Sequence, residues 1–143
     1  MSRTCCPKLL FTIWIVWYEW FPDYAYDYSG ISVSAGDEIK ACVTASSTTS
    51  GVAKIENLTN GQTVTKDLSS SYALCGQDAE WIVEDFEEGS SLVPFADFGT
   101  VTFSGTSASG YTASGANVLD IEQNGEVLTS VTISGSDVTV QYQ

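Results

Sequence analysis

Residues 79–86 read Ala79-Glu80-Trp81-Ile82-Val83-Glu84-Asp85-Phe86, in which acidic and apolar side chains alternate. A period of two is typical of a β-strand, because successive side chains point to opposite faces of a sheet. We therefore predict a strand from about Ala79 to Asp85 whose two faces carry different chemistry. One face holds Glu80, Ile82, Glu84 and Phe86, and the other holds Trp81 and Val83. A carboxylate set among apolar neighbours suits a general acid or base. The alternative is a solvated strand whose charges protect an exposed edge.

The composition excludes several classes of function. The chain has 143 residues, enough for one domain with a single core, and its 18 acidic residues outweigh 5 basic ones to give a net charge of −13. Such a chain cannot build the basic face that nucleic acids and anionic membranes require. It has no histidine. Ser-His-Asp and Cys-His catalysis are therefore excluded, as are the usual catalytic zinc sites.

The rest of the chain consists of short alternating segments between turn residues, without a helical period. Turns are indicated at Ala35-Gly36-Asp37, Thr59-Asn60-Gly61-Gln62, Gly125 and Gly135. Further strands are expected at 17–21, 38–45, 52–58, 62–68, 100–104, 118–122, 128–134 and 137–142. Residues 23–28 alternate tyrosine with Asp or Ala and fit either an aromatic loop or the wall of a cleft. This spacing predicts an all-β chain folded as an antiparallel β-sandwich.

Three minor features leave alternatives open. Residues 1–16 place basic residues before an apolar run, which fits a signal peptide, a strand or a stretch foreign to the fold. The run is too short to span a membrane. Cys42 and Cys75 are candidate disulfide members whose partners the sequence does not show, and no cysteine has zinc-ligand spacing. Asn57-Leu58-Thr59 is a glycosylation sequon, meaningful only in a secreted chain.

Several collinear motifs resemble the fungal glutamic peptidases, or eqolisins. They run in the family's order from Trp17 to the C-terminus, and together they are more specific than any one of them. The motifs are Trp17-Tyr18-Glu19-Trp20-Phe21-Pro22-Asp23, Ser34-Ala35-Gly36-Asp37, Glu56-Asn57-Leu58-Thr59 with Gly61-Gln62, Ala79-Glu80-Trp81-Ile82-Val83-Glu84 and Phe95-Ala96-Asp97-Phe98-Gly99. The resemblance implies two curved antiparallel sheets, similar to the concanavalin A-like sandwiches.

The resemblance also implies a secreted acid endopeptidase that needs no metal or cofactor. Its catalytic pair is a glutamate and a glutamine, and the glutamate of the Ala-Glu-Trp-Ile motif corresponds to Glu80. Glu19, in the Trp-Tyr-Glu-Trp motif, is a candidate supporting carboxylate, and Glu84 is another. Glu84 lies about 13 Å from Glu80 along a strand, too far to share a proton with it. The expected substrate is a protein or peptide bound by a monomer. The groove residues are expected to be Trp17, Trp20, Tyr24 and Tyr26.

The family's glutamine precedes the Trp-Tyr-Glu-Trp strand in a segment that residues 1–16 do not resemble. We therefore expect residues 1–16 to be a non-family segment, an aberrant or signal-like start. We expect residues 17–143 to form the C-terminal part of the peptidase-like sandwich, with N-terminal strands and the catalytic glutamine missing. The resemblance would make Cys75 the partner of an absent cysteine. The glutamines present match no catalytic motif: Gln62, Gln77, Gln123, Gln141 and Gln143.

Two alternative functions stay open at this point. A curved sandwich with exposed tryptophan and tyrosine could bind glycans or peptides without cleaving them. A chain that lacks part of its sandwich could also be a degenerate product with no function of its own, because unpaired sheet edges favour aggregation.

Overall fold

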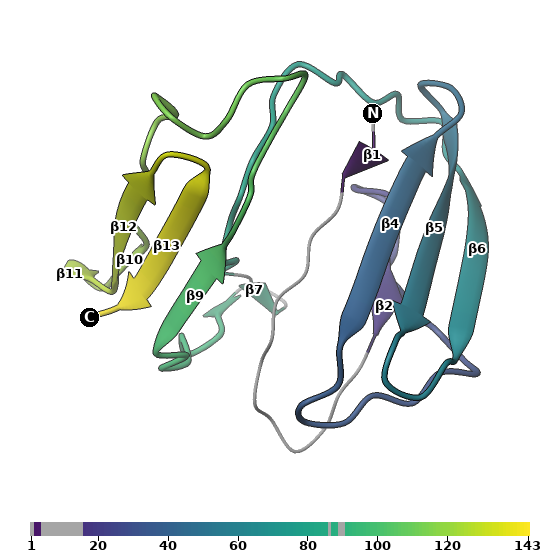
Figure 1. Ribbon diagram of the computed structural model, residues 1–143, viewed down its shortest axis with the longest axis horizontal. Coiled ribbons are helices and arrows are strands. Elements are labelled where there is room, and N and C mark those ends of the chain that lie inside the picture. Colours follow the sequence, from purple (N-terminus) through teal and green to yellow (C-terminus); the bar gives the residue numbers. More distant parts are fainter. Residues whose placement is uncertain (1, 4–15, 86, 89–90) are drawn as a thin grey trace. The chain divides into compact units, whose positions relative to one another are not determined.

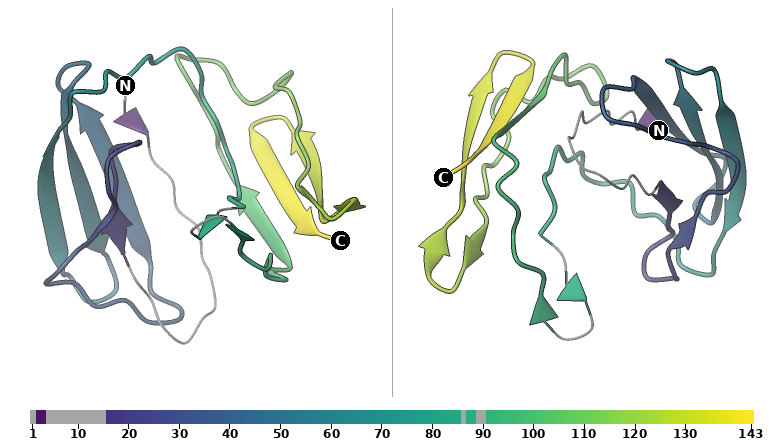
Figure 2. Two further views of the ribbon diagram at one scale, coloured as in Figure 1. Left: turned by 180° about the vertical axis from the view of Figure 1, so that it is seen from behind. Right: turned by 90° about the horizontal axis from the view of Figure 1, so that it is seen from below.

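The computed structural model describes residues 2–3, 16–85, 87–88 and 91–143. Within these ranges every regular element is a β-strand, and every pair of strands is antiparallel. The chain divides into two compact units, residues 1–77 and 78–143. Figure 1 shows the strands of each unit, and Figure 2 shows them from behind and from below. The all-β antiparallel prediction is confirmed.

The first unit is built on a sheet in the order β1-β4-β5-β6 (Figure 1). Its strands are β1 (Ser2–Arg3), β4 (Ile39–Ala45), β5 (Ser50–Asn57) and β6 (Thr63–Ser69). Strand β5 is bonded along both edges, so that Ala53 pairs with Val43 on one side and Lys66 on the other. Gly51 must lack a side chain, because a Cβ there would lie 2.7 Å from the Thr44 carbonyl oxygen. The expected strands at 38–45, 52–58 and 62–68 are confirmed within two residues.

A buried amide holds the turn between β5 and β6. The Asn57 side chain is 1% exposed, and its Nδ2 donates to the Ser32 carbonyl at 2.9 Å and to Asp37 Oδ2 at 2.8 Å. Its Oδ1 accepts hydrogen bonds from the main-chain nitrogens of Thr59 and Asn60. The whole hydrogen-bonding capacity of one amide thus ties the 32–37 loop to the turn. In the folded chain the sequon at Asn57 is therefore closed to modification.

An aromatic cluster packs against the β5–β6 side of the first unit. The short strands β2 (Trp17–Tyr18) and β3 (Tyr26–Asp27) pair Tyr18 with Tyr26, and these rings stack with centroids 5.7 Å apart. Tyr28 meets Tyr18 edge-on at 4.9 Å and donates its hydroxyl to the Ala53 carbonyl. Burial, with a smaller contribution from Tyr18, raises the pKa of Tyr28. The Lys66 ammonium lies 5.5 Å from the Tyr18 ring centroid, within the range of a cation–π interaction.

The second unit contains three antiparallel sheets. The largest has the order β12-β13-β9, formed by β12 (Thr129–Ser134), β13 (Asp137–Tyr142) and β9 (Thr100–Phe103). Val138 and Val140 of β13 are buried, and the Tyr142 ring packs on Phe95 and Phe98. Two hairpins complete the unit: β7 (Glu87–Glu88) with β8 (Ser91–Leu92), and β10 (Glu122–Gln123) with β11 (Glu126–Val127).

Three sequence predictions differ from the structure. Residues 79–85 form no strand, because no neighbouring strand in the described ranges bonds to their backbone. The strand expected at 118–122 is instead the short β10, which turns back through Asn124 and Gly125 at positive φ. The ladder predicted at 17–21 ends at Tyr18. Most of the 1–16 segment lies outside the described residues, although Ser2–Arg3 pairs with β4.

The Asn57→Asp substitution tests the buried amide. It keeps the side-chain shape but turns the donor into a carboxylate oxygen that faces Asp37 and the Ser32 carbonyl. We expect the free energy of unfolding at neutral pH to fall by about 2–4 kcal/mol, since two buried donors are lost and a charge is added. Urea unfolding measures this change. The same substitution at the exposed Asn117 should change the unfolding free energy by about 0.5 kcal/mol or less; equal effects at both sites would contradict the assignment.

An ion-pair triad on β4 and β5 gives a second prediction. Lys54 Nζ lies 2.8 Å from Glu56 Oε1, and Lys40 Nζ lies 3.3 Å from Oε2. The hydrogen bond from Lys54 and then that from Lys40, with the charges of both, hold the pKa of Glu56 below its ordinary 4.5. A carboxylate whose pKa is lowered by folding stabilises the fold above its unfolded pKa and loses that contribution as the pH falls through the folded value.

Glu56→Gln should therefore lower the melting temperature at neutral pH, and this loss should shrink as the pH falls from neutral toward pH 2 and the wild-type carboxyl takes up its proton. Thermal unfolding followed by circular dichroism across this range provides the measurement. An equal loss of melting temperature at both ends of the range would show that the substitution acts through packing and not through the charge of Glu56.

Candidate functional site

The segment that carries Glu80 alternates in exposure as its sequence predicts. Glu80, Ile82 and Glu84 are exposed, with Ile82 at 61%, whereas Trp81, Val83 and Asp85 are half-buried. The exposure of residues 80–84 therefore alternates as the predicted faces require, although no ladder forms in the described residues; Phe86, predicted on the same face as Glu80, lies outside the described residues. Among the described residues, no apolar enclosure surrounds the Glu80 carboxylate, because its side chain is open to solvent.

A glutamine holds the end of this segment. Gln123 Nε2 donates to Asp85 Oδ1 at 3.0 Å and to the Val93 carbonyl oxygen at 3.2 Å. Asp85 precedes the β7–β8 hairpin and Val93 follows it, so one amide spans the base of that hairpin. The sequence alone gave no sign of this contact, because Gln123 and Asp85 are 38 positions apart and share no motif.

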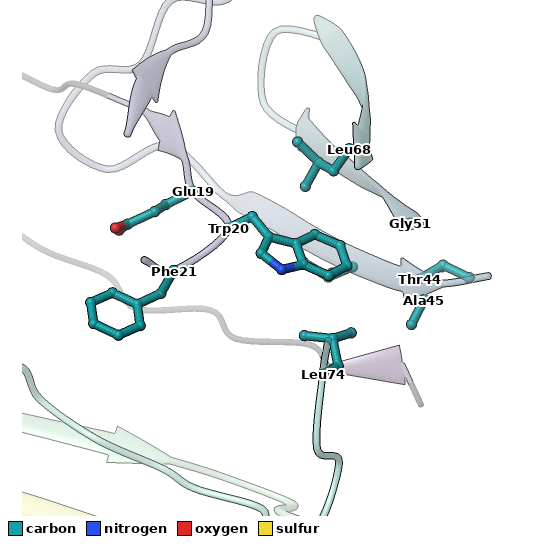
Figure 3. Close-up of a pocket in the computed structure, with 9 residues that line it drawn as sticks. Glu19, Trp20, Phe21, Thr44, Ala45, Gly51, Leu68 and Leu74 are labelled. Atoms are coloured by element: carbon teal, nitrogen blue, oxygen red, sulfur yellow. The ribbon is translucent and has the colours of Figure 1, made fainter. Parts of the chain in front are cut away.

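The stretch after β2 presents two chemically different sides in the first unit. Trp20 donates its indole N–H to the Tyr72 carbonyl oxygen at 2.8 Å. Figure 3 shows the Trp20 ring lying toward Leu68 and Leu74, whereas Glu19 and Phe21 point away from these leucines. A cavity of about 200 Å³ lies here. Residues 19–21, Leu68, Leu74 and residues of β4 and β5 line it. Trp20 thus belongs to the packing side.

The four aromatic residues expected in a substrate groove do not lie on one surface. The β2–β3 register pairs Trp17 with Asp27 and Tyr18 with Tyr26, so Tyr26 faces the same way as Tyr18 and Trp17 faces the opposite way. Trp17 is 50% exposed, and Tyr24 is 83% exposed in the loop between the strands. Of the supporting carboxylates, Glu84 shares the exposed side with Glu80, while Glu19 belongs to the first unit.

The described residues also bear on other kinds of site. Within residues 2–3, 16–85, 87–88 and 91–143, no group of three acidic or cysteine side chains is placed to hold a metal ion. No helix long and apolar enough to cross a bilayer occurs in the same ranges. Cys42 lies in β4 and Cys75 is exposed after β6.

Comparison with known proteins identifies the class of this chain. The profile of the Peptidase A4 family matches residues 12–142. The chain therefore belongs to the Peptidase A4 family, and the resemblance to the glutamic peptidases is confirmed. Aspergillopepsin-2 of Aspergillus niger is 56% identical over 137 residues, and Scytalidopepsin B of Scytalidium lignicola is 42% identical over 142. These alignments cover 92% and 88% of this chain but 49% and 54% of the two relatives, so the chain spans about half their length.

Solved structures agree with this assignment. The crystal structure of aspergilloglutamic peptidase from Aspergillus niger is 55% identical with a TM-score of 0.76, covering 89% of this chain and 78% of that one. Scytalido-glutamic peptidase bound to a transition state analog inhibitor is 41% identical with a TM-score of 0.77, covering 89% and 68%. The predicted fold class, a β-sandwich of the glutamic peptidases, is confirmed by these likenesses.

Substitution of the two tryptophans tests their assignment to opposite sides. Trp20→Phe removes the donor to the Tyr72 carbonyl and reduces the side chain beside the cavity. We expect the free energy of unfolding to fall by about 1–3 kcal/mol. Trp17→Phe is the matched control, and because Trp17 is half-exposed it should change stability by about 0.5 kcal/mol or less. Urea unfolding of both variants decides the point, and the reverse order of effects would refute the assignment.

Proposed function

We propose that Glu80 is the general base of an acid endopeptidase. The observation that carries this proposal is the Ala79-Glu80-Trp81-Ile82 segment of a Peptidase A4 chain, in which the carboxylate is solvent-accessible while Trp81 and Val83 are half-buried. A base that acts on water must be reachable by both water and substrate. Half-buried neighbours restrict the movement of its backbone, which helps to keep the carboxylate in place.

In the proposed reaction, Glu80 removes a proton from a water molecule that attacks the carbonyl carbon of the scissile peptide bond. The carbonyl oxygen becomes an oxyanion, which an amide N–H donor stabilises. The protonated Glu80 then gives its proton to the leaving amine, and a carboxylic acid and an amine are released.

The amide donor of this reaction is proposed to come from outside the printed residues. Two arguments support that origin. The chain spans about half the length of Aspergillopepsin-2 and Scytalidopepsin B. Three of the five glutamines in the chain also have other side-chain partners: Gln62 accepts from Ser32, Gln123 donates to Asp85, and Gln143 donates to Ser130. Without such a donor the rate should be lower by about 10²–10³-fold.

The substrate in this proposal is a protein or peptide, cleaved in acid outside the cell by a monomer. Support comes from the inhibitors and peptides in similar structures: scytalido-glutamic peptidase holds a peptide based transition state analog. Trp17 and Tyr24 of the first unit are exposed, as side chains that contact a substrate must be. Trp20 is assigned to packing because of its hydrogen bond to Tyr72, whereas Tyr26 is 55% exposed and stays a predicted groove residue.

Acid digestion of a denatured protein substrate tests the proposal. The Glu80→Gln variant keeps the size of the side chain but removes its basicity, and we expect the initial rate of new amino-terminus formation to fall by about 10²–10⁴-fold. Glu126→Gln, an exposed change of the same kind in β11, is the control and should leave the rate unchanged. Activity that survives Glu80→Gln would refute the assignment. Peptide binding without cleavage by the wild-type chain would instead favour a binding module.

A further inference from the structure

We infer that Gln123 is a positioning residue for Glu80, an inference that rests on the proposed function. Asp85 follows Glu80 by five positions in the same segment, and the Gln123 amide fixes Asp85 relative to Val93. Among the residues that the structure describes, Gln123 makes the only hydrogen bond to residues 79–85. A segment without a ladder therefore depends on one side chain for its polar attachment.

The backbone that carries Gln123 is held in place by hydrogen bonds. Gln123 belongs to β10, whose partner β11 returns through a turn with Asn124 and Gly125 at positive φ. The buried Thr129 hydroxyl accepts a hydrogen bond from the Ile121 nitrogen at 2.8 Å, and the Leu128 nitrogen donates to the Ile121 carbonyl. The hairpin is thereby joined to the start of β12. The side chain of Gln123 thus projects from backbone that is hydrogen-bonded on both sides of its turn.

The two acceptors at this point call for a side chain that can donate two hydrogen bonds. Both partners of Gln123 are oxygen acceptors, a carboxylate and a main-chain carbonyl. A primary amide offers two N–H groups on one nitrogen, so it can satisfy both acceptors at once. Gln123, Asp85 and Val93 are all half-buried, where an acceptor deprived of its donor is not fully compensated by water.

The consequence is a division of roles within one segment. Trp81 and Val83 are half-buried, and the hydrogen bond from Gln123 holds the end of the segment at Asp85. Apolar contact alone is non-directional and allows the segment to slide, whereas a hydrogen bond at Asp85 fixes one register. Displacement of a catalytic group by about 1 Å can cost about 10²-fold in rate.

The test uses the full 143-residue chain labelled with 5-fluorotryptophan and followed by ¹⁹F NMR. Trp81 lies between Glu80 and Asp85 and reports the position of the segment; its resonance is assigned by loss of signal in Trp81→Phe. Gln123→Met keeps the length of the side chain but removes both donors. We expect it to shift or broaden the Trp81 resonance while leaving those of Trp17 and Trp20, in the other unit, in place.

Two further variants separate the hydrogen bond from packing. Gln141→Met makes the same change at an exposed position of β13 and should leave the Trp81 resonance unmoved. Gln123→Lys restores a donor of similar length and should return the resonance toward its wild-type position. An unmoved Trp81 signal in Gln123→Met, or a Lys variant that behaves like the Met variant, would overturn the inference.

Activity measurements then connect the contact to the reaction. In acid digestion, Gln123→Met should lower kcat about 10- to 100-fold with KM little changed, and Gln123→Lys should recover part of the loss. If the wild-type chain shows no Glu80-dependent cleavage, the proposed function fails, while the ¹⁹F result still decides whether Gln123 fixes the segment. If the resonance shifts but kcat does not change, Gln123 is structural and the positioning role is refuted.

Discussion

Main-chain pairing along both edges of β5 is the constraint on which the first unit depends. Each residue of a strand that is bonded on both sides must match two neighbours at once, which fixes the register of β4 and β6 together. Asn57 is the last residue of β5, and its buried side-chain amide makes the hydrogen bonds that follow the end of the ladder. It donates to the Ser32 carbonyl and to Asp37. The aromatic cluster then packs on strands whose positions are already set, with Tyr28 bonded to the β5 carbonyl of Ala53.

Sequence predicts well where turn chemistry and alternation agree. The turn at Asn60-Gly61 and the one at Gly135 each join strands of six or more residues, and both hairpins lie where expected. Prediction fails for residues 79–85 for a physical reason: alternation fixes which side chains point together but not whether a partner strand is present. The exposure of Glu80, Ile82 and Glu84 therefore follows the pattern even though the backbone forms no ladder.

Only part of the candidate site could be predicted from the sequence. The collinear motifs between Trp17 and Gly99 predicted a glutamic peptidase, and the comparisons confirm that family. The grouping of aromatic residues was not predictable from composition, because the β2–β3 register and the Trp20 hydrogen bond decide which rings share a side. The contact between Gln123 and Asp85 also lay beyond sequence reasoning, since it joins distant positions by a side chain and no periodicity records such a bond.

The two sides of the Trp17–Phe21 stretch have a consequence for evolvability. Tyr18 is held by ring stacking and Trp20 by a hydrogen bond to the Tyr72 carbonyl. Most replacements at these two positions therefore lower the folding stability and are removed by selection. Trp17 and Phe21 are 50% and 83% exposed, so replacements there should change the folding stability less. Alternate positions of one short stretch can therefore diverge at different rates. A library that varies only the odd-numbered positions would explore new surface chemistry while sparing the scaffold.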